Sequence, residues 1–228
     1  MSFDAPIASF TVVHSSTPGS TSGTVGVSDV SFDIFCFSRG SRIETPHGPR
    51  AVEDLAIGDL VVTKDSGVQA IKWIGRKKVS AQRLATEQNL RPVRLLKDAF
   101  GDGIPCRDMM ISPQHKILIS DWRAEMYFAS SEILAPAKGL LNDRTIRIVN
   151  EPADIEYIHM MFEKHEIVTV DNLRSESFFV GDNAVSTLDQ EARHELFSLF
   201  PELGADQASF GATARRALKV REASVLSQ

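Results

Sequence analysis

The sequence predicts an all-β domain with a short helical extension at its C-terminal end. Short apolar runs recur between Arg42 and Ser177, and turns containing Gly, Pro or Asp separate them. No long stretch of helical periodicity lies between these runs, whereas the pattern changes to helical spacing after Gly181.

The composition is that of an ordinary globular protein. Of the 228 residues, 43% are apolar and 24% charged, and the net charge is −5. This length favours one domain and at most two, and the apolar content excludes a wholly disordered chain. The acidic balance gives no reason to expect a nucleic-acid partner, and no apolar stretch is long enough for a membrane span. No secretory signal is recognisable, so the localisation stays open between the cytoplasm and export by another route.

We divide the chain into three parts. Residues 1–29 form an N-terminal segment, with a strand over 8–14 and a flexible Ser/Thr/Gly-rich link over 15–23. Residues 30–180 form the β domain, which begins with an alternating strand from Val30 that runs directly into Cys36. Residues 181–228 form the helical extension.

Within the β domain, the clearest strands are predicted at residues 42–45, 59–63, 69–74 and 116–119. Residues 155–170 contain two β runs around a polar turn at Glu163–Lys164, which predicts a hairpin. Residues 51–59 and 136–143 are weakly similar, an internal echo in which each segment leads into a β run. It is either an internal duplication or two similar turns.

Two helices are predicted in the extension. Leu188, Ala192, Leu196 and Leu199 fall near helical spacing, and Pro201 ends that helix. A second, basic helix is predicted from Thr213 to Leu226.

Few side chains are candidates for a catalytic or ligand-binding role. The two cysteines, Cys36 and Cys106, cannot form a disulfide scaffold or a four-ligand zinc site by themselves. Each is either a buried apolar group or a reactive thiol, and we expect Cys106 to be buried. Ser112 and His115 lie three residues apart at a turn between apolar runs, as either a surface turn or a paired donor set.

His159 and His165 lie on the predicted hairpin, where they are either structural or catalytic. A third ligand at regular spacing is missing, so we expect neither zinc nor another metal, and no cofactor is implied.

The order of these motifs resembles the Hedgehog/intein (Hint) family, and most of all its stand-alone bacterial members. The order is Cys-Phe, Thr-Pro-His-Gly, Val-Glu-Asp-Leu-x-x-Gly-Asp, Ser-Pro-Gln-His and a Tyr…His…Val stretch, over about residues 34–180. The resemblance implies an all-β horseshoe with a pseudo-two-fold arrangement, which would account for the weak echo. It also implies site roles for Cys36, for Ser112 with His115 in the Thr-x-x-His block, and for His165.

Two departures from the family pattern bear on function. Many inteins carry an aspartate just after the tyrosine, whereas Ile158 and His159 follow Tyr157 here, and His159 either replaces that acid or does not. The stretch Leu173 to Ser177 lacks the His-Asn pair of inteins, so asparagine cyclisation and full splicing are not expected.

The chemistry implied by the resemblance is self-cleavage. The Cys36 thiol would attack the Phe35 carbonyl and convert the Phe35–Cys36 amide into a thioester, an intramolecular step favoured by proximity. His115 would protonate the leaving nitrogen, Ser112 would hydrogen-bond the amide or its oxyanion, and His165 would lie in a second layer. The substrate would be the chain's own N-terminal segment, and the acyl acceptor would be water or an external thiol or amine.

Two other functions stay open. The fold could serve as a non-catalytic structural or binding module, which the missing aspartate favours. A thiol hydrolase acting on other molecules is the third possibility, but Cys36 does not lie in a Gly-rich strand-to-helix elbow.

Overall fold

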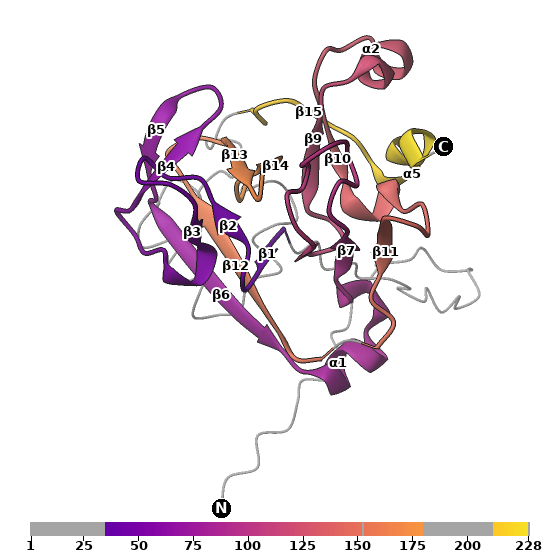
Figure 1. The fold of residues 1–228 in the computed structure, drawn as a ribbon, viewed down its shortest axis with the longest axis horizontal. Helices are drawn as coiled ribbons and strands as arrows, with labels where there is room; N and C mark the ends of the chain where they lie inside the picture. The colour runs from indigo at the N-terminus through magenta and orange to yellow at the C-terminus, as the bar shows by residue number, and fades with distance from the viewer. Residues whose placement is uncertain (1–34, 152, 180–211, 228) are drawn as a thin grey trace, which may run out of the picture. The chain divides into compact units, whose positions relative to one another are not determined.

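The computed structural model describes residues 35–151, 153–179 and 212–227, and every element and contact named here lies within these residues. Figure 1 shows that strands dominate them and that helices are short. The predicted all-β class with a small C-terminal helix is confirmed. The strand at 8–14, the link at 15–23, the start of the strand at Val30 and the helix around Leu196 lie outside the described residues.

The strands form two sheets, and nearly all neighbours within them are antiparallel. In spatial order, the first sheet contains β11 (Ile146–Ile148), β7 (Val93–Leu95), β8 (Met109–Ile111), β1 (Phe37–Ser38), β12 (Ile155–Met161) and β6 (Trp73–Val79). The short strand β1 therefore lies between β8 and β12, and its register places Phe37 opposite both Ile111 and Ile158. This placement brings residues from two distant parts of the chain, β8 and β12, to Cys36.

The second sheet runs through β15 (Arg216–Ala217), β10 (Ile133–Pro136), β9 (Lys116–Ile119), β14 (Leu173–Glu176), β13 (Ile167–Val170), β2 (Arg42–Ile43) and β3 (Arg50–Ala51). The hairpin of β4 (Leu60–Thr63) and β5 (Gly67–Ala70) joins it where β4 pairs with β13. Asp171 and Asn172 both have positive φ and form the tight turn between β13 and β14.

The helices are brief. They are α1 (Ala81–Thr86), α2 (Trp122–Phe128) and α5 (Val220–Ala223), with 3-10 turns η1 (Val52–Asp54), η2 (Gln88–Leu90), η3 (Ala137–Leu140) and η6 (Ser224–Ser227). Ser80 and Asp121 cap α1 and α2 by accepting backbone N–H groups, as N-cap residues do. Within the described ranges, every helix is too short or too polar to span a bilayer.

The predicted strand at 116–119 coincides with β9, and the echo segments each contain a 3-10 turn, η1 and η3. The predicted hairpin over 155–170 is wrong, because β12 and β13 belong to different sheets. Instead, β12 pairs along its length with β6, and Figure 1 shows these two long strands side by side. The chain then crosses to the second sheet, where β13 pairs with β14.

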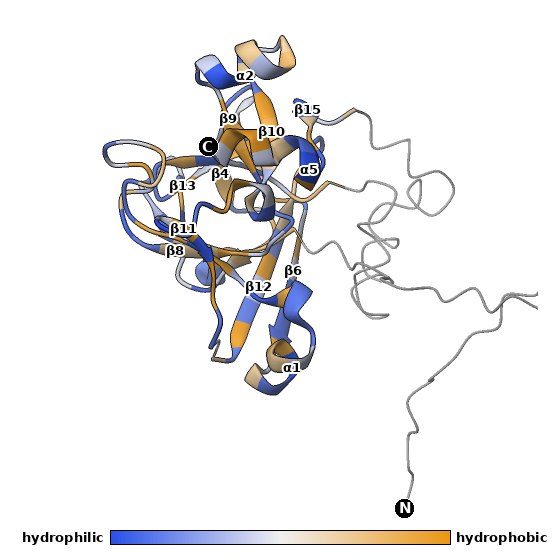
Figure 2. Ribbon diagram, turned by 90° about the vertical axis from the view of Figure 1, so that its right-hand side faces the viewer, coloured by the Kyte–Doolittle hydropathy of each residue, from blue (hydrophilic) through white to orange (hydrophobic). Residues whose placement is uncertain are grey.

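The predicted helix from Thr213 to Leu226 is shorter than expected. Arg216 and Ala217 are extended and pair in parallel with β10, and helix begins only at Val220. The backbone groups of these two residues therefore form hydrogen bonds with the free edge of β10 instead of the bonds they would have formed within a helix. After it, Ala223 and Leu226 are buried in the core, and Figure 2 shows the hydrophobic colouring of the neighbouring β9 and β10.

Candidate active site around Cys36

Cys36 lies immediately before β1 and is completely buried. Its side chain belongs to an apolar cluster of Val79, Leu84, Leu90, Ile155 and Tyr157. Burial raises the pKa of the Cys36 thiol well above its usual value, and the charge of Lys77 opposes this only in part. The thiol is therefore protonated at neutral pH, and it needs a base before it can act as a nucleophile.

Ser112 is hydrogen-bonded to both the backbone N–H and the backbone C=O of Cys36. It follows β8, whose pairing with β1 brings it alongside. The Cys36 N–H donates to Ser112 Oγ at 2.9 Å, and the Ser112 N–H donates to the Cys36 carbonyl at 3.1 Å. The nitrogen of the Phe35–Cys36 peptide is thus bound to a hydroxyl that is itself buried.

His159 contacts both of the atoms that would react. It lies on β12, next to the residue that pairs with Phe37. Its Nδ1 is 2.8 Å from the Phe35 carbonyl oxygen, and its Nε2 is 3.0 Å from Cys36 Sγ. Because a carbonyl oxygen can only accept, Nδ1 carries the proton, and Nε2 is left to accept the proton of the thiol.

The His159 ring is neutral at physiological pH. Burial lowers its pKa to about 4, against the opposing effect of its bond to Phe35. A tilted Trp73 ring and an edge-on Phe178 ring pack around it, with centroids at 6.3 and 5.1 Å. These two rings shield the imidazole from water and fix its orientation.

His115 takes part in a different contact. Its Nε2 is hydrogen-bonded to Ser175 Oγ, and its ring stands edge-on to Phe37 with centroids 4.4 Å apart. Burial lowers its pKa to about 4. The predicted pair therefore separates: Ser112 contacts the peptide between residues 35 and 36, whereas His115 is hydrogen-bonded to Ser175 on β14 and packs against Phe37.

His165 lies further away, within a buried ionic group. Its Nδ1 accepts the Ala214 N–H at 3.0 Å, so Nε2 carries the proton, 3.4 Å from Glu176 Oε2. Glu176 also binds Lys116 through Nζ at 3.2 Å. Burial raises the pKa of Glu176, but Lys116 and the neighbouring histidines outweigh it and lower that pKa to about 2.

Three residues of this site were not predicted from sequence: Lys116, Ser175 and Glu176. The one available signal was the carboxylate of Glu176 just before the apolar Phe178 and Phe179, because a carboxylate that becomes buried needs a partner. His159 was predicted only as a possible accessory residue, although it makes the most direct contacts with the bond.

Cys106 is exposed, contrary to the prediction that it is buried, and both thiols are free. It lies within the loop between β7 and β8 rather than in a strand, so no sheet covers it. Within the described ranges, no three His, Cys, Asp or Glu side chains converge as metal ligands would.

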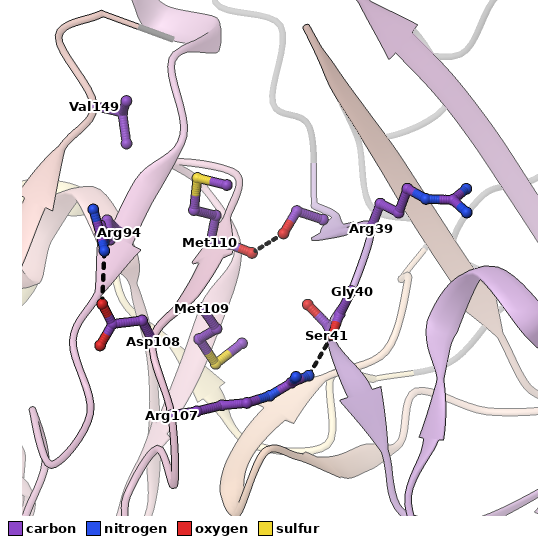
Figure 3. Close-up of a pocket in the computed structure, with 10 residues that line it drawn as sticks. Arg39, Gly40, Ser41, Arg94, Arg107, Asp108, Met109, Met110 and Val149 are labelled. Atoms are coloured by element: carbon purple, nitrogen blue, oxygen red, sulfur yellow. Dashed lines mark hydrogen bonds and ion pairs between the residues drawn. The ribbon is translucent and has the colours of Figure 1, made fainter. Parts of the chain in front are cut away.

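A separate cavity of about 460 Å³ opens beyond the other end of β1. Figure 3 shows Arg39, Arg94 and Arg107 around it, with Arg94 bound to Asp108 and Arg107 bound to the Gly40 carbonyl. Its lining includes none of Cys36, Ser112, His115 and His159. The candidate chemistry is therefore built into the sheet itself rather than into this cavity.

Comparison with known proteins finds one matching family model and several similar solved structures. A family model described as the Hint domain matches residues 35–182. Similar solved structures include a bacterial intein-like domain from Clostridium thermocellum, 13% identical over 64% of this chain and 99% of that one, with a TM-score of 0.42. The gp41-1 intein is 12% identical over 61% and 96%, with a TM-score of 0.38. A DnaB intein from Synechocystis sp. PCC 6803 is 13% identical over 63% and 99%, with a TM-score of 0.37. A search of curated proteins gives no match.

Proposed function

The chain belongs to the Hint domain family, whose members are autoprocessing domains, and on this premise we propose that it cleaves its own backbone between Phe35 and Cys36 through a thioester. The observation that carries the proposal is the position of His159, 3.0 Å from the thiol sulfur and 2.8 Å from the carbonyl oxygen of the bond to be cleaved. One imidazole can therefore serve both the nucleophile and the developing oxyanion.

In the first step, Cys36 Sγ attacks the Phe35 carbonyl carbon while its proton passes to His159 Nε2. The carbonyl π electrons move to oxygen, where the Nδ1–H of His159 donates to the growing negative charge. The reaction is intramolecular, so no entropy is lost in bringing the two groups together.

In the second step, the bond between the Phe35 carbon and the Cys36 nitrogen breaks. A lone pair on the oxyanion re-forms the carbonyl, the electron pair of the broken bond stays on nitrogen, and the proton that His159 took from sulfur is delivered to that nitrogen. The products are a Phe35 thioester on Cys36 Sγ and a free amine at Cys36, with no net proton change. Ser112 Oγ, already bonded to that nitrogen, keeps it oriented during the transfer.

The thioester then passes its acyl group to water or to an external thiol or amine, which releases residues 1–35. Full splicing is not part of the proposal, because the stretch from Leu173 to Ser177 has no His-Asn pair. In this scheme His159 is the general base, and His115 and His165 support the surrounding structure.

Intact-mass measurement over time tests the proposal. We expect a fragment that begins at Cys36, and hydroxylamine or a small thiol should accelerate its appearance, because thioesters react with them and amides do not. Cys36→Ala should abolish the fragment, whereas Cys106→Ala, a change at an exposed thiol, should leave the rate unchanged. A folded, reduced chain that stays at full length for days with added thiol would overturn the proposal.

A second candidate function is a non-catalytic module with this fold. The complete burial of Cys36, with the pKa of its thiol raised, favours it, because both oppose formation of the thiolate. The same mass measurement separates the two functions.

A further inference from the structure

Lys116 places its ammonium over the aromatic ring of Phe35. The Nζ atom lies 4.0 Å from the ring centroid, within the range of a cation–π contact. Lys116 is the first residue of β9, directly after His115, and its side chain is only 18% exposed. The contact joins the residue on the acyl side of the proposed cleavage bond to the second sheet.

A buried carboxylate fixes this ammonium in place. The Glu176 oxygens lie 3.2 and 3.4 Å from Lys116 Nζ, and Glu176 Oε1 also accepts the Lys116 backbone N–H at 2.9 Å. The Glu176 side chain is 2% exposed, so the ion pair is largely shielded from water. A lysine held at two points loses little further entropy when it binds a ring.

We infer that Lys116 selects an aromatic residue at position 35 as the last residue of the segment to be released. A ring offers its negative face to the ammonium, whereas an aliphatic side chain of similar size offers no such charge. The acyl substrate class is therefore a peptide that ends in an aromatic residue. This inference rests on the proposed self-cleavage, and it deepens that proposal by naming the substrate.

The contact also bears on the geometry of attack. His159 fixes the Phe35 carbonyl oxygen, and Lys116 fixes the side chain of the same residue. With both held, the carbonyl carbon keeps one orientation toward Cys36 Sγ, so a larger share of molecules is in position to react.

A double-mutant cycle on the cleavage rate tests the selection. The four chains are the parent, Phe35→Leu, Lys116→Met and the double variant. Phe35→Leu should slow cleavage by about 2- to 30-fold when Lys116 is present and should have little further effect beside Lys116→Met. Phe35→Tyr should cleave like the parent, because it keeps the ring.

The charge of Lys116 is separated from its bulk by two further variants. Lys116→Arg should restore the preference for Phe35 over Leu, because a guanidinium also binds ring faces. Lys164→Met, which removes an exposed lysine in the turn before His165, is the matched control and should leave that preference unchanged. A preference for Phe35 that persists in Lys116→Met would overturn the inference.

Thermal unfolding in the Cys36→Ala background gives a readout that does not depend on cleavage. The same cycle should show a coupling between Phe35 and Lys116 of about 2–4 °C in Tm. If this coupling appears but the parent chain never cleaves, the contact stands and the proposed function fails. If the parent cleaves but neither the rate nor Tm shows coupling, the selection by Lys116 is wrong.

Discussion

At the scale of single residues, His159 has the central position. The family pattern has an acid just after the tyrosine, and here an imidazole two residues after Tyr157 reaches the thiol and the carbonyl together. Its neutral ring suits a base, although its low pKa makes it a weak one for a thiol whose own pKa is raised. We therefore expect slow cleavage that depends strongly on this residue.

We predict that His159→Gln slows cleavage by about 10²- to 10⁴-fold, the range for loss of a general acid–base group. Glutamine can still donate to the Phe35 carbonyl, but it cannot take the thiol proton. The rate is measured by intact mass, with His47→Ala, a change at an exposed histidine, as the control. An unchanged rate in His159→Gln would remove this histidine from the mechanism.

Ser112 gives a prediction about stability. Ser112→Ala removes the acceptor of the buried Cys36 N–H, and an unpaired buried donor costs about 1–3 kcal/mol. Ser112→Thr keeps the hydroxyl and should lose less. Urea unfolding measures the free energy of unfolding of both variants, in the Cys36→Ala background so that cleavage does not interfere. Equal losses in the two variants would show that the Ser112 hydroxyl does not contribute to stability.

At the scale of elements, the sequence is a good guide to strands and a poor guide to their partners. Residues 116–119 end in three consecutive apolar residues and are bounded by turn residues, so their strand is evident from local pattern alone. Whether β12 returns on itself or crosses to another sheet depends on pairing with β6, far away in sequence. Local pattern carries no such information, which is why the hairpin prediction failed.

The same limit applies to the candidate site. Cys36, Ser112, His115 and His165 were identifiable as chemical groups in a family order. Their partners were not, because Ser175 and Glu176 come from β14, which pairs with β9 only in the folded chain. The burial that shifts the pKa values of His115 and His159 also arises only from the packing of the two sheets.

Gly139 provides a test of how the C-terminal helix is seated. A Cβ atom there would lie 2.5 Å from Ala223 Cβ and 2.9 Å from the Val220 carbonyl oxygen, both on α5. We predict that Gly139→Ala lowers the free energy of unfolding by about 1–3 kcal/mol, the usual range for overpacking.

Ala223→Gly should relieve part of that clash, so the double variant should lose less than the sum of the two single changes. Urea unfolding of the four chains measures this coupling. Strictly additive losses would mean that α5 does not pack on Gly139.

At the scale of the whole molecule, buried neutral histidines tie folding to pH. The folded pKa values of His115 and His159 are about 4, against an ordinary value of 6.5. Between these two values the unfolded chain binds protons that the folded chain does not, so falling pH favours unfolding. Their full contribution to stability is present above pH 6.5 and is lost as pH falls toward 4.

We predict that the free energy of unfolding falls with pH between about 5 and 6 with a slope that approaches two protons, about 2.7 kcal/mol per pH unit. Urea unfolding of Cys36→Ala at several pH values gives the slope. His115→Asn should reduce it by about one proton. A flat profile between pH 6.5 and 4 would contradict the assignment of buried, neutral rings.

The burial of Cys36 has a consequence for the direction of the reaction. Under the proposed mechanism the acyl shift leaves an amine at the Cys36 nitrogen, inside the same dry cluster that raises the pKa of the thiol. Such an amine resists protonation, stays nucleophilic and remains next to the thioester, so the amide re-forms readily. The forward step is then a reversible equilibrium, and only capture of the acyl group by an outside molecule makes it irreversible. The observed rate of cleavage then depends on access of that molecule as well as on the rate of the shift, so a small thiol should raise it and a bulky one should hardly act at all.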